Sequence, residues 1–313
     1  MNRRKTIPVA SINRKSDWKV MQMNSDTKQN INEEESFDTY PEAQMVQEVE
    51  LDILTKFAEA CDKLGLTYFL DGGTLLGAVR HEGFIPWDDD VDVGMPRKDY
   101  EEFLKHGQVL LGDDYFLQTT KTDPAYPGLF AKIRKNGTRF IEWNQRNLKM
   151  NKGIYIDIFP YDKLPMEGRR EYADAMRKLT KQYLIRSIPD RCAHNDGTLK
   201  WWVIAIARRL EHYVYCLRSK KKLAEKIDRE FVKYNDEEFE EDYCTCHAFL
   251  YPIWLRESMI YPVKKIGFCG KEFSAPIDHD TYLKEMYGDY MKIPPKEERI
   301  GHRPVDIYIG ESE

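Results

Sequence analysis

Apolar positions recur at helical spacing from Glu42 to Leu64, and this pattern predicts an amphipathic helix. Gly65 follows and is suited to end it, because glycine adopts the left-handed conformation common after a helix. The run Leu66–Leu70 is short, apolar and aromatic, which is typical of a buried strand. We next expect a short helix at Leu75–Arg80, a strand at Asp88–Val93 and a helix that Pro96 opens and that continues to Lys105.

Strand patterns follow at Tyr115–Thr119, Gly128–Lys135, Thr138–Trp143 and Gly153–Pro160. The Asn136-Gly137 pair separates the second from the third, and this dipeptide is a strong signal of a two-residue hairpin turn. We therefore expect these two strands to pair with each other. Proline lacks a backbone donor, so we expect the last strand to stop at Pro160.

The remainder of the chain is helical and charged from Glu167 to about Phe239, with short strands or loops in Tyr251–Phe273 and a helix at Asp278–Tyr287. This order predicts an α+β fold, in which a mixed sheet with flanking helices is followed by a mainly helical region. We expect a polar, disordered arm at 1–40 and a catalytic core at 41–165. The region at 166–313 is expected to be part of the same catalytic unit.

The composition is that of an ordinary globular protein, with 313 residues, 42% of them hydrophobic, and a formal net charge of -5. This net charge argues against a general nucleic-acid binder. The longest apolar run, Trp201–Ala207, is far shorter than the ~18–20 residues that a membrane-spanning helix needs. The first residues lack the sustained apolar run of a signal peptide, so we expect a cytoplasmic location.

The six cysteines show no spacing typical of a disulfide scaffold, and we expect reduced thiols. Cys244, Cys246 and His247 resemble half of a zinc site. Structural zinc takes four ligands, and no second Cys and His cluster follows at a suitable spacing. Ordinary thiols are the interpretation that we favour.

The acidic segment Asp88–Val93 is the most informative part of the chain for function. Alternate residues of a strand share a face, so Asp90 and Asp92 project together while the valines enter the core. Asp88 joins them if the strand extends that far. Two carboxylates about 7 Å apart along a strand repel each other without a cation, and Mg²⁺ bridges protein carboxylates to phosphates. The alternatives are a solvated acidic loop, which does not need the alternating valines, and a pair of acids in salt bridges with nearby arginines.

Gly72, Gly73 and Thr74 lie between a predicted strand and a predicted helix. Glycine lets backbone N–H groups approach a phosphate, and a helix N-terminus adds a favourable dipole. Thr74 can cap the helix or donate its hydroxyl. A plain tight turn is the alternative, but the acids that follow favour a site for the phosphates of a donor.

Asp157 is the candidate for a third carboxylate, because it is the one acid in an otherwise apolar run. Metal-assisted phosphoryl transfer uses such a group as a ligand or as a base. A buried ion pair or a cap is the alternative role for Asp157, and Asp162 is a weaker candidate for the same position.

Positive groups are expected to face the phosphates of the donor. Arg80 and His81 end the short helix close to the acids, and His81 can instead orient a neighbour by a hydrogen bond. Lys132 and Arg134 alternate on one strand and so share a face. Exposed hairpin charge is the alternative for this second pair.

The stretch from Gly73 to Asp92 (GTLLGAVRHEGFIPWDDDVD) resembles the signature of the LicD family. That family is related to the fukutin-type transferases and belongs to the polymerase-beta-like nucleotidyltransferase superfamily. The resemblance continues in Gly153–Pro160 (GIYIDIFP) and Phe268–Pro276 (FCGKEFSAP), and it covers about residues 42–303. It implies that Asp90 and Asp92 hold the metal, that Asp157 is the third acid, and that the glycine turn binds the donor.

The resemblance also implies the chemistry. The family transfers phosphocholine from CDP-choline, or a phospho-alditol from a CDP-alditol, to a surface glycan such as teichoic acid, lipopolysaccharide or capsule, and the acceptor can be lipid-linked. Mg²⁺, or Mn²⁺ in its place, is the expected cofactor, and nucleic acid is not an expected partner. Two alternatives stay open: a nucleotidyltransferase that acts on a small hydroxyl compound, and a non-catalytic relative that binds glycan or metal.

The segment from Trp201 to Leu223 mixes aromatic and aliphatic residues with arginines and lysines. A basic amphipathic helix can lie on an anionic membrane, which would give peripheral contact with the inner face of the cell membrane. An ordinary bundle helix with a solvated basic end is the alternative, and we favour it on the sequence alone.

Overall fold

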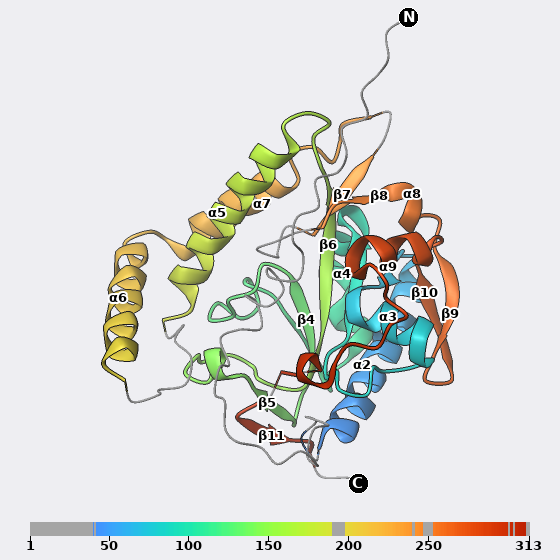
Figure 1. Cartoon of the computed structure of the whole chain (residues 1–313), viewed down its shortest axis with the longest axis horizontal. Helices are drawn as coiled ribbons and strands as arrows, with labels where there is room; N and C mark the ends of the chain where they lie inside the picture. Colours follow the sequence, from blue (N-terminus) through green and yellow to red (C-terminus); the bar gives the residue numbers. More distant parts are fainter. Residues whose placement is uncertain are drawn as a thin grey trace, which may run out of the picture.

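The computed structural model describes residues 40, 42–189, 198–239, 242–246, 253–299, 301–302 and 304–310 (Figure 1). Residues 1–39 of the expected arm, with Pro41, Cys192 and His247, lie outside this description. The α-helices are α2 (Ala43–Leu64), α3 (Gly72–His81), α4 (Arg97–Leu111), α5 (Arg169–Ser187), α6 (Leu199–Cys216), α7 (Lys220–Phe231), α8 (Glu257–Ile260) and α9 (His279–Tyr287). The strands are β1 (Phe69–Leu70), β2 (Asp92–Pro96), β3 (Tyr115–Gln118), β4 (Ala131–Lys135), β5 (Arg139–Ile141), β6 (Tyr155–Lys163), β7 (Tyr243–Thr245), β8 (Leu255–Arg256), β9 (Lys264–Phe268), β10 (Lys271–Ala275) and β11 (Asp306–Tyr308).

The central sheet is mixed, and it confirms the predicted α+β class. Its strand order is β1-β2-β6-β4-β3, and β7 extends β6 toward β8. Strands β2 and β6 run parallel, whereas β1, β4 and β3 pair antiparallel with their neighbours. Helices α2 and α4 both pack against β6. The parallel pair at the centre holds the segments in which the sequence places the acids.

Several helices form where the pattern predicts them. Helix α2 ends at Gly65, whose φ of 64° confirms the left-handed cap. Helix α4 begins one residue after Pro96 and runs past Lys105 to Leu111. The region after β6 is helical as predicted, in α5, α6 and α7. None of the helices within the described ranges combines the length and the apolar character that a membrane crossing requires.

The hairpin predicted at Asn136-Gly137 is wrong. A turn forms there, with Gly137 at a φ of 79°, but β5 pairs with β11 near the C-terminus and not with β4. The reason is that both edges of β4 are already filled, one by β3 and the other by β6. The chain after the turn therefore leaves the central sheet.

The predicted stop at Pro160 is also wrong, because β6 continues to Lys163. The amide of Asp157 donates to the carbonyl of Val91, so alternate amides of β6 point toward β2 and the nitrogen of Pro160 points the other way. On that edge of β6, the pairing with β4 ends at Ile158 and the pairing with β7 starts at Asp162. Pro160 lies between these two partners, so no neighbouring strand requires a hydrogen bond from its nitrogen.

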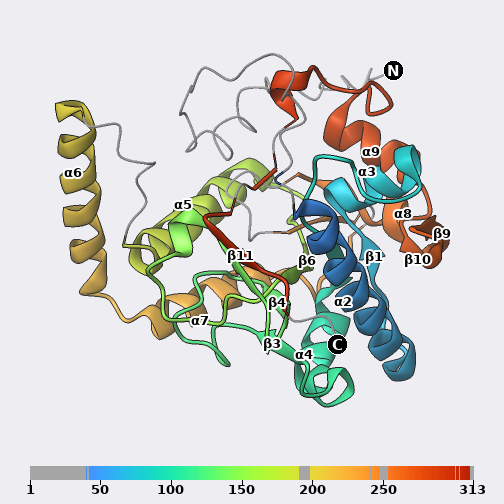
Figure 2. The same cartoon turned by 90° about the horizontal axis from the view of Figure 1, so that it is seen from below.

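Two hydrophobic clusters organise the chain. The larger one joins α2, the central sheet and the C-terminal elements β10 and α9. The smaller one joins α5 and α7 through Met176, Tyr183, Leu223, Ile227 and Phe231. Figures 1 and 2 show α5, α6 and α7 as an arm beside the sheet, with α6 at its outer end.

Candidate active site

The glycine turn is held by a buried carboxylate. Helix α3 begins at Gly72, earlier than the predicted Leu75, and Gly72 has a φ of 49°. The side chain of Asp71 caps this helix by accepting from the amide of Gly72 at 2.7 Å. The hydroxyls of Tyr161, at 2.8 Å, and of Tyr282 also donate to Asp71. Burial raises the pKa of Asp71, whereas these hydrogen bonds lower it.

Thr74 does not cap α3, although the sequence allowed that role. Its hydroxyl oxygen instead accepts from the backbone amide of Asp92 at 2.8 Å. The amide of Asp71 donates to the carbonyl of Asp92 at 3.0 Å. These two contacts fix the start of β2 against the first turn of α3, which confirms that the glycine turn and the acidic segment are adjacent.

The acids Asp88, Asp90 and Asp92 lie together beside this turn. Strand β2 begins only at Asp92, so the predicted strand at Asp88–Val93 is too long at its start. The alternation nevertheless holds: Asp88, Asp90 and Asp92 are half-buried, whereas Asp89 is buried. A Cβ at Gly73 would stand 2.7 Å from Asp88 Oδ2. The carboxylates of Asp88 and Asp92 therefore border the turn, and a side chain at Gly73 would collide with Asp88.

Mutual repulsion marks this group of acids. Burial raises the pKa of Asp92 well above its usual range, and the charges of Asp90 and Asp157 raise it further. The pKa of Asp88 is also raised well above its usual range, by burial and then by Asp90. Carboxylates that destabilise one another's charged forms are the environment in which a bound cation is favourable.

Asp157 lies opposite Asp92 in the register of β2 and β6. Its Oδ1 is 2.6 Å from Nζ of Lys132, on the neighbouring strand β4. Lys132 Nζ also lies 3.3 Å from the ring centroid of Tyr155. Burial raises the pKa of Asp157 and Lys132 opposes this rise. Asp157 thus forms a buried ion pair with Lys132, which is the alternative role given above for this acid. Lys132 is buried, so the alternative of an exposed charge on a hairpin is wrong for it.

The remaining predicted cations have protein partners. Arg134 is buried, and its guanidinium donates to Gln118 and to the carbonyl of Gly153. Arg80 donates to the carbonyl of Tyr290 at 2.8 Å and to His81 Nε2 at 3.0 Å. Arg80 and His81 stay only partly covered. A phosphate-binding role for these residues remains a prediction.

Asp162, the weaker candidate, is engaged elsewhere. Its carboxylate accepts from Arg97 Nε at 2.8 Å and from Asn235 Nδ2 at 2.7 Å, and a further bond joins it to Arg97 Nη2. This buried contact fastens the start of α4 and the segment after α7 to β6. Asp162 is therefore a structural residue.

The sequence analysis missed three residues around the acids. His302 lies beside the acidic segment, with Nδ1 at 3.0 Å from Asp89 Oδ1 and Nε2 at 3.6 Å from Asp90 Oδ2. Glu50 of α2 is buried, and Asp89 and Asp90 add to the rise of its pKa that burial causes. Tyr287 of α9 lies near Gly72, where a Cβ would stand 3.7 Å from its hydroxyl. Tyr287 begins the stretch Tyr287–Tyr290 (YGDY), which also resembles the family, but no local motif marks Glu50 or His302, because only the fold brings them to the site.

The residues present fit a hard divalent cation shared with a phosphate ligand. Within the described ranges, no group of three or more His, Cys, Asp and Glu side chains is arranged to hold a metal ion by itself. Mg²⁺ characteristically binds one or two carboxylates together with substrate phosphates and water. Asp90 and Asp92, in a group of mutually repelling acids beside an open glycine turn, match that donor set.

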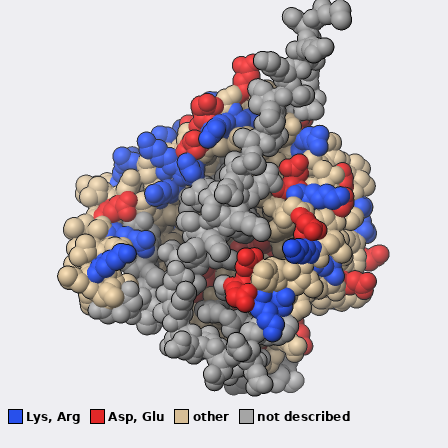
Figure 3. All heavy atoms as spheres, in the orientation of Figure 1, with Lys and Arg blue, Asp and Glu red and all other residues tan. Residues whose placement is uncertain are grey.

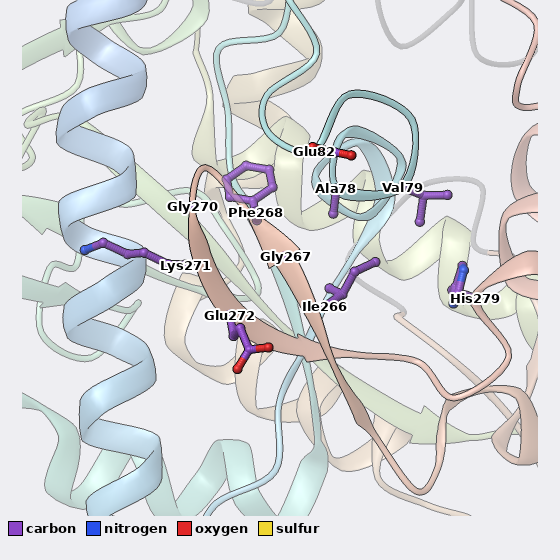
Figure 4. A pocket seen from close by; sticks show the side chains of 10 residues that line it. All are labelled: Ala78, Val79, Glu82, Ile266, Gly267, Phe268, Gly270, Lys271, Glu272 and His279. Atoms are coloured by element: carbon purple, nitrogen blue, oxygen red, sulfur yellow. The ribbon is translucent and has the colours of Figure 1, made fainter.

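Two other features lie apart from the acids. A shallow pocket between α3 and the β9–β10 hairpin is lined by Ala78, Ile266, Phe268 and Glu272 among others, and it contains none of the predicted site residues (Figure 4). Cys244 and Cys246 are buried and form no disulfide, and because His247 lies outside the described residues, their interpretation as ordinary thiols stays a prediction.

Comparisons with known proteins extend the local resemblance to most of the chain. The family model described as LicD/FKTN/FKRP, nucleotidyltransferase domain, matches residues 65–187. A lipopolysaccharide cholinephosphotransferase LicD of Haemophilus influenzae is 30% identical over 265 residues, which cover 83% of this chain and 95% of that protein. An uncharacterized protein of Rickettsia prowazekii is 51% identical over 109 residues, or 34% of this chain and 36% of that protein. The mouse ribitol 5-phosphate transferase FKRP is 57% identical over 35 residues, which are 11% of this chain and 7% of that protein.

Proposed function

This chain belongs to the LicD family and is a phosphotransferase, and we propose that it moves phosphocholine from a CDP-activated donor to a hydroxyl group of a cell-surface glycan. The relative from Haemophilus influenzae, which the chain matches over most of both lengths, is a lipopolysaccharide cholinephosphotransferase. Lipopolysaccharide is therefore the first acceptor to test, ahead of teichoic acid and capsule. A CDP-alditol is the alternative donor, because the short match to FKRP is to a ribitol 5-phosphate transferase.

The observation that carries the proposal is the junction of α3 and β2. There the capped glycine turn and the half-buried acids face the same space, joined by the contact of Thr74 with Asp92. Backbone amides at a helix N-terminus favour a diphosphate, and adjacent carboxylates favour the cation that accompanies it. A donor with a nucleoside diphosphate supplies the diphosphate for the amides and the accompanying cation for the carboxylates.

In the proposed mechanism, Asp90 and Asp92 would hold Mg²⁺, or Mn²⁺ in its place, and the bound cation would offset negative charge on the donor diphosphate and on the departing nucleotide monophosphate. The turn at Gly72 and Gly73 orients the diphosphate, and Arg80, in the last turn of α3, adds positive charge. The acceptor hydroxyl must also lose its proton, and a general base is needed to accept it.

We assign that base to Asp157. The acceptor oxygen forms a bond to phosphorus, the bond from phosphorus to the oxygen of the nucleotide monophosphate breaks, and the acceptor proton passes to the carboxylate of Asp157. Lys132, at 2.6 Å, holds that carboxylate in place and balances its charge before the transfer. With Asp157 engaged in this way, Asp90 and Asp92 remain for the metal, and Mg²⁺ characteristically takes one or two carboxylates together with substrate phosphates.

The test is release of CMP from CDP-choline with Mg²⁺ and purified lipopolysaccharide, together with transfer of labelled choline to the glycan. We compare wild type, Asp90→Asn, Asp92→Asn, and the control Asp113→Asn, which alters an exposed carboxylate near the end of α4. Release and transfer by wild type and the control only, with a loss of about a thousandfold or more in the site variants, support the proposal.

Other outcomes redirect or overturn it. Release from a CDP-alditol alone identifies the alternative donor. Formation of pyrophosphate from CTP and a small phosphorylated alcohol points instead to nucleotidyl transfer. Equal activity of wild type and both site variants removes the assigned metal pair.

A further inference from the structure

Helix α6 (Leu199–Cys216) carries an apolar face that nothing in the described part of the chain covers. None of its residues belongs to either hydrophobic cluster. It rests on α5 by its opposite face, where the buried ring of His212 donates from Nδ1 to the carbonyl of Ile185 at 2.8 Å and accepts from the thiol of Cys216. In Figure 1 this helix forms the outer end of the arm.

The uncovered face is continuous along the helix. Leu199, Val203, Ile206, Leu210, Tyr213 and Leu217 are between 58% and 88% exposed. They follow one another at spacings of four and three residues, which places them on one side of an α-helix. Trp202 and Val214, also exposed, widen the face to about 120° at 3.6 residues per turn. An 18-residue helix in a monomer in water would not gain from such a face.

Basic side chains border this face on both sides. Arg209 lies next to one edge of the face, and Lys200 and Arg218 lie next to the other edge. All three are exposed. From Leu199 to Lys222 the sequence has seven lysines and arginines and one acid, Glu211, in a chain whose net charge is -5. In Figure 3 the left edge, where Figure 1 places α6, shows tan surface with several blue side chains and one red patch among it.

We propose that α6 is a membrane-surface helix, which lies in the headgroup region of an anionic lipid bilayer with this face turned inward. The charge pattern selects this occupant: lysine and arginine at the edges reach anionic headgroups while their stems and the apolar residues enter the acyl boundary. The helix is not long and apolar enough to cross a bilayer, and Arg208 and Arg209 interrupt it.

A second copy of the chain fits the same face less well. Two α6 helices packed through it would bring basic edges against basic edges, with Glu211 as the single acid in each helix to offset them. The proposal does not rest on the donor, the acceptor or the metal, because lipid binding is measured without any of them.

The test is sedimentation of the full chain with vesicles of phosphatidylcholine, with or without ~30% phosphatidylglycerol, at low and at high salt. The apolar variant is Ile206→Ser with Leu210→Ser. Its matched control is Val109→Ser with Met45→Ser, two exposed apolar residues on α4 and α2. The charge variant is Lys200→Gln with Arg209→Gln.

Wild type and the control should bind the anionic vesicles, and the apolar variant should bind at least about tenfold more weakly, since two buried aliphatic side chains are lost. The charge variant should show a smaller preference for phosphatidylglycerol and a weaker dependence on salt than wild type. Failure of wild type to bind at low salt overturns the proposal, as does equal binding by the apolar variant. A wild-type dimer that the apolar variant dissociates, seen by light scattering without vesicle binding, assigns the face to a second copy instead.

Discussion

Lys132 and Asp157 face each other across β4 and β6, and Nζ of the lysine lies 2.6 Å from Oδ1 of the acid. Both side chains are almost fully buried, so neither charge can turn to water when the other is removed. Asp92 stands on the other side of Asp157 in the sheet and adds negative charge. The ion pair therefore fixes the electrostatic balance on one side of the candidate site.

Lys132→Met should therefore cost about 3 kcal/mol of unfolding free energy, because it leaves a buried carboxylate without its cation. The double variant Lys132→Met with Asp157→Asn should recover most of that loss, since no charge is then stranded. Urea unfolding of both variants measures the difference. If the single and double variants are equally stable, the pair does not compensate charge as described.

His302→Ala should loosen the acidic segment. The ring of His302 is 3.0 Å from the buried carboxylate of Asp89, and the backbone amide of His302 donates to the same oxygen at 2.8 Å. Losing a hydrogen bond to a charged, buried group costs about 2 kcal/mol, and we expect activity to fall because Asp90 follows directly in sequence. His106→Ala, at an exposed position on α4, is the control. Thermal unfolding and initial rates of both variants test this; equal effects would mean that the contact with Asp89 is incidental.

Lys220 gives a prediction for pH that lies away from the candidate site. Burial and, after it, the positive charge of Arg186 lower its pKa from 10.5 to about 8. Nζ donates to the carbonyls of Pro124 and Tyr126 at 2.7 and 2.8 Å. Above about pH 8 the folded chain therefore releases a proton that the unfolded chain keeps until about pH 10.5.

The unfolded state binds more protons in that window, so stability rises with pH through this group. The unfolding free energy of wild type should therefore increase relative to Lys220→Met between about pH 8 and 10.5 and should level off above it. Below pH 8 the difference should be flat, because both states keep the proton. Urea unfolding at pH 7, 8, 9 and 10 measures it. A difference that stays constant over all four values contradicts the lowered pKa.

The local patterns were enough to predict α2 with its Gly65 cap, the strand before the glycine turn, the helical region after β6 and the adjacency of that turn to Asp90 and Asp92. Each of these depends on residues close together in sequence. The resemblance to the LicD family added what periodicity cannot give, namely which chemistry those residues serve.

The errors share a different origin, which is pairing between distant segments. Asn136-Gly137 makes a turn, yet β5 joins β11 because β3 and β6 already fill the edges of β4. Pro160 sits inside a strand because no neighbour needs its missing donor. His302 contacts Asp89 although 213 positions separate them in the sequence, and no residue pattern predicts a contact over such a separation.

Two glycines of α3 are needed for different reasons, Gly77 for packing and Gly73 for the candidate site. A Cβ at Gly77 would stand 2.4 Å from the carbonyl oxygen of Gly83, which is backbone and cannot turn away. A Cβ at Gly73 would stand 2.7 Å from Asp88 Oδ2, which is the end of a side chain that can rotate. Substitution by alanine should therefore lower the stability at Gly77 and the activity at Gly73.

Gly77→Ala should lose about 2 to 3 kcal/mol of unfolding free energy, because α3 must move away from the loop that follows it. Gly73→Ala should stay within about 1 kcal/mol of wild type, since alanine favours the helix and the clash is relieved by rotation of Asp88. That rotation displaces a carboxylate that contacts Asp90, so kcat/KM for the transfer should fall by about tenfold to a hundredfold. Urea unfolding and initial rates on the same two proteins give the four numbers. Full activity in a stable Gly73→Ala protein would show that the turn does not need to stay open, and the donor diphosphate would then have to bind elsewhere.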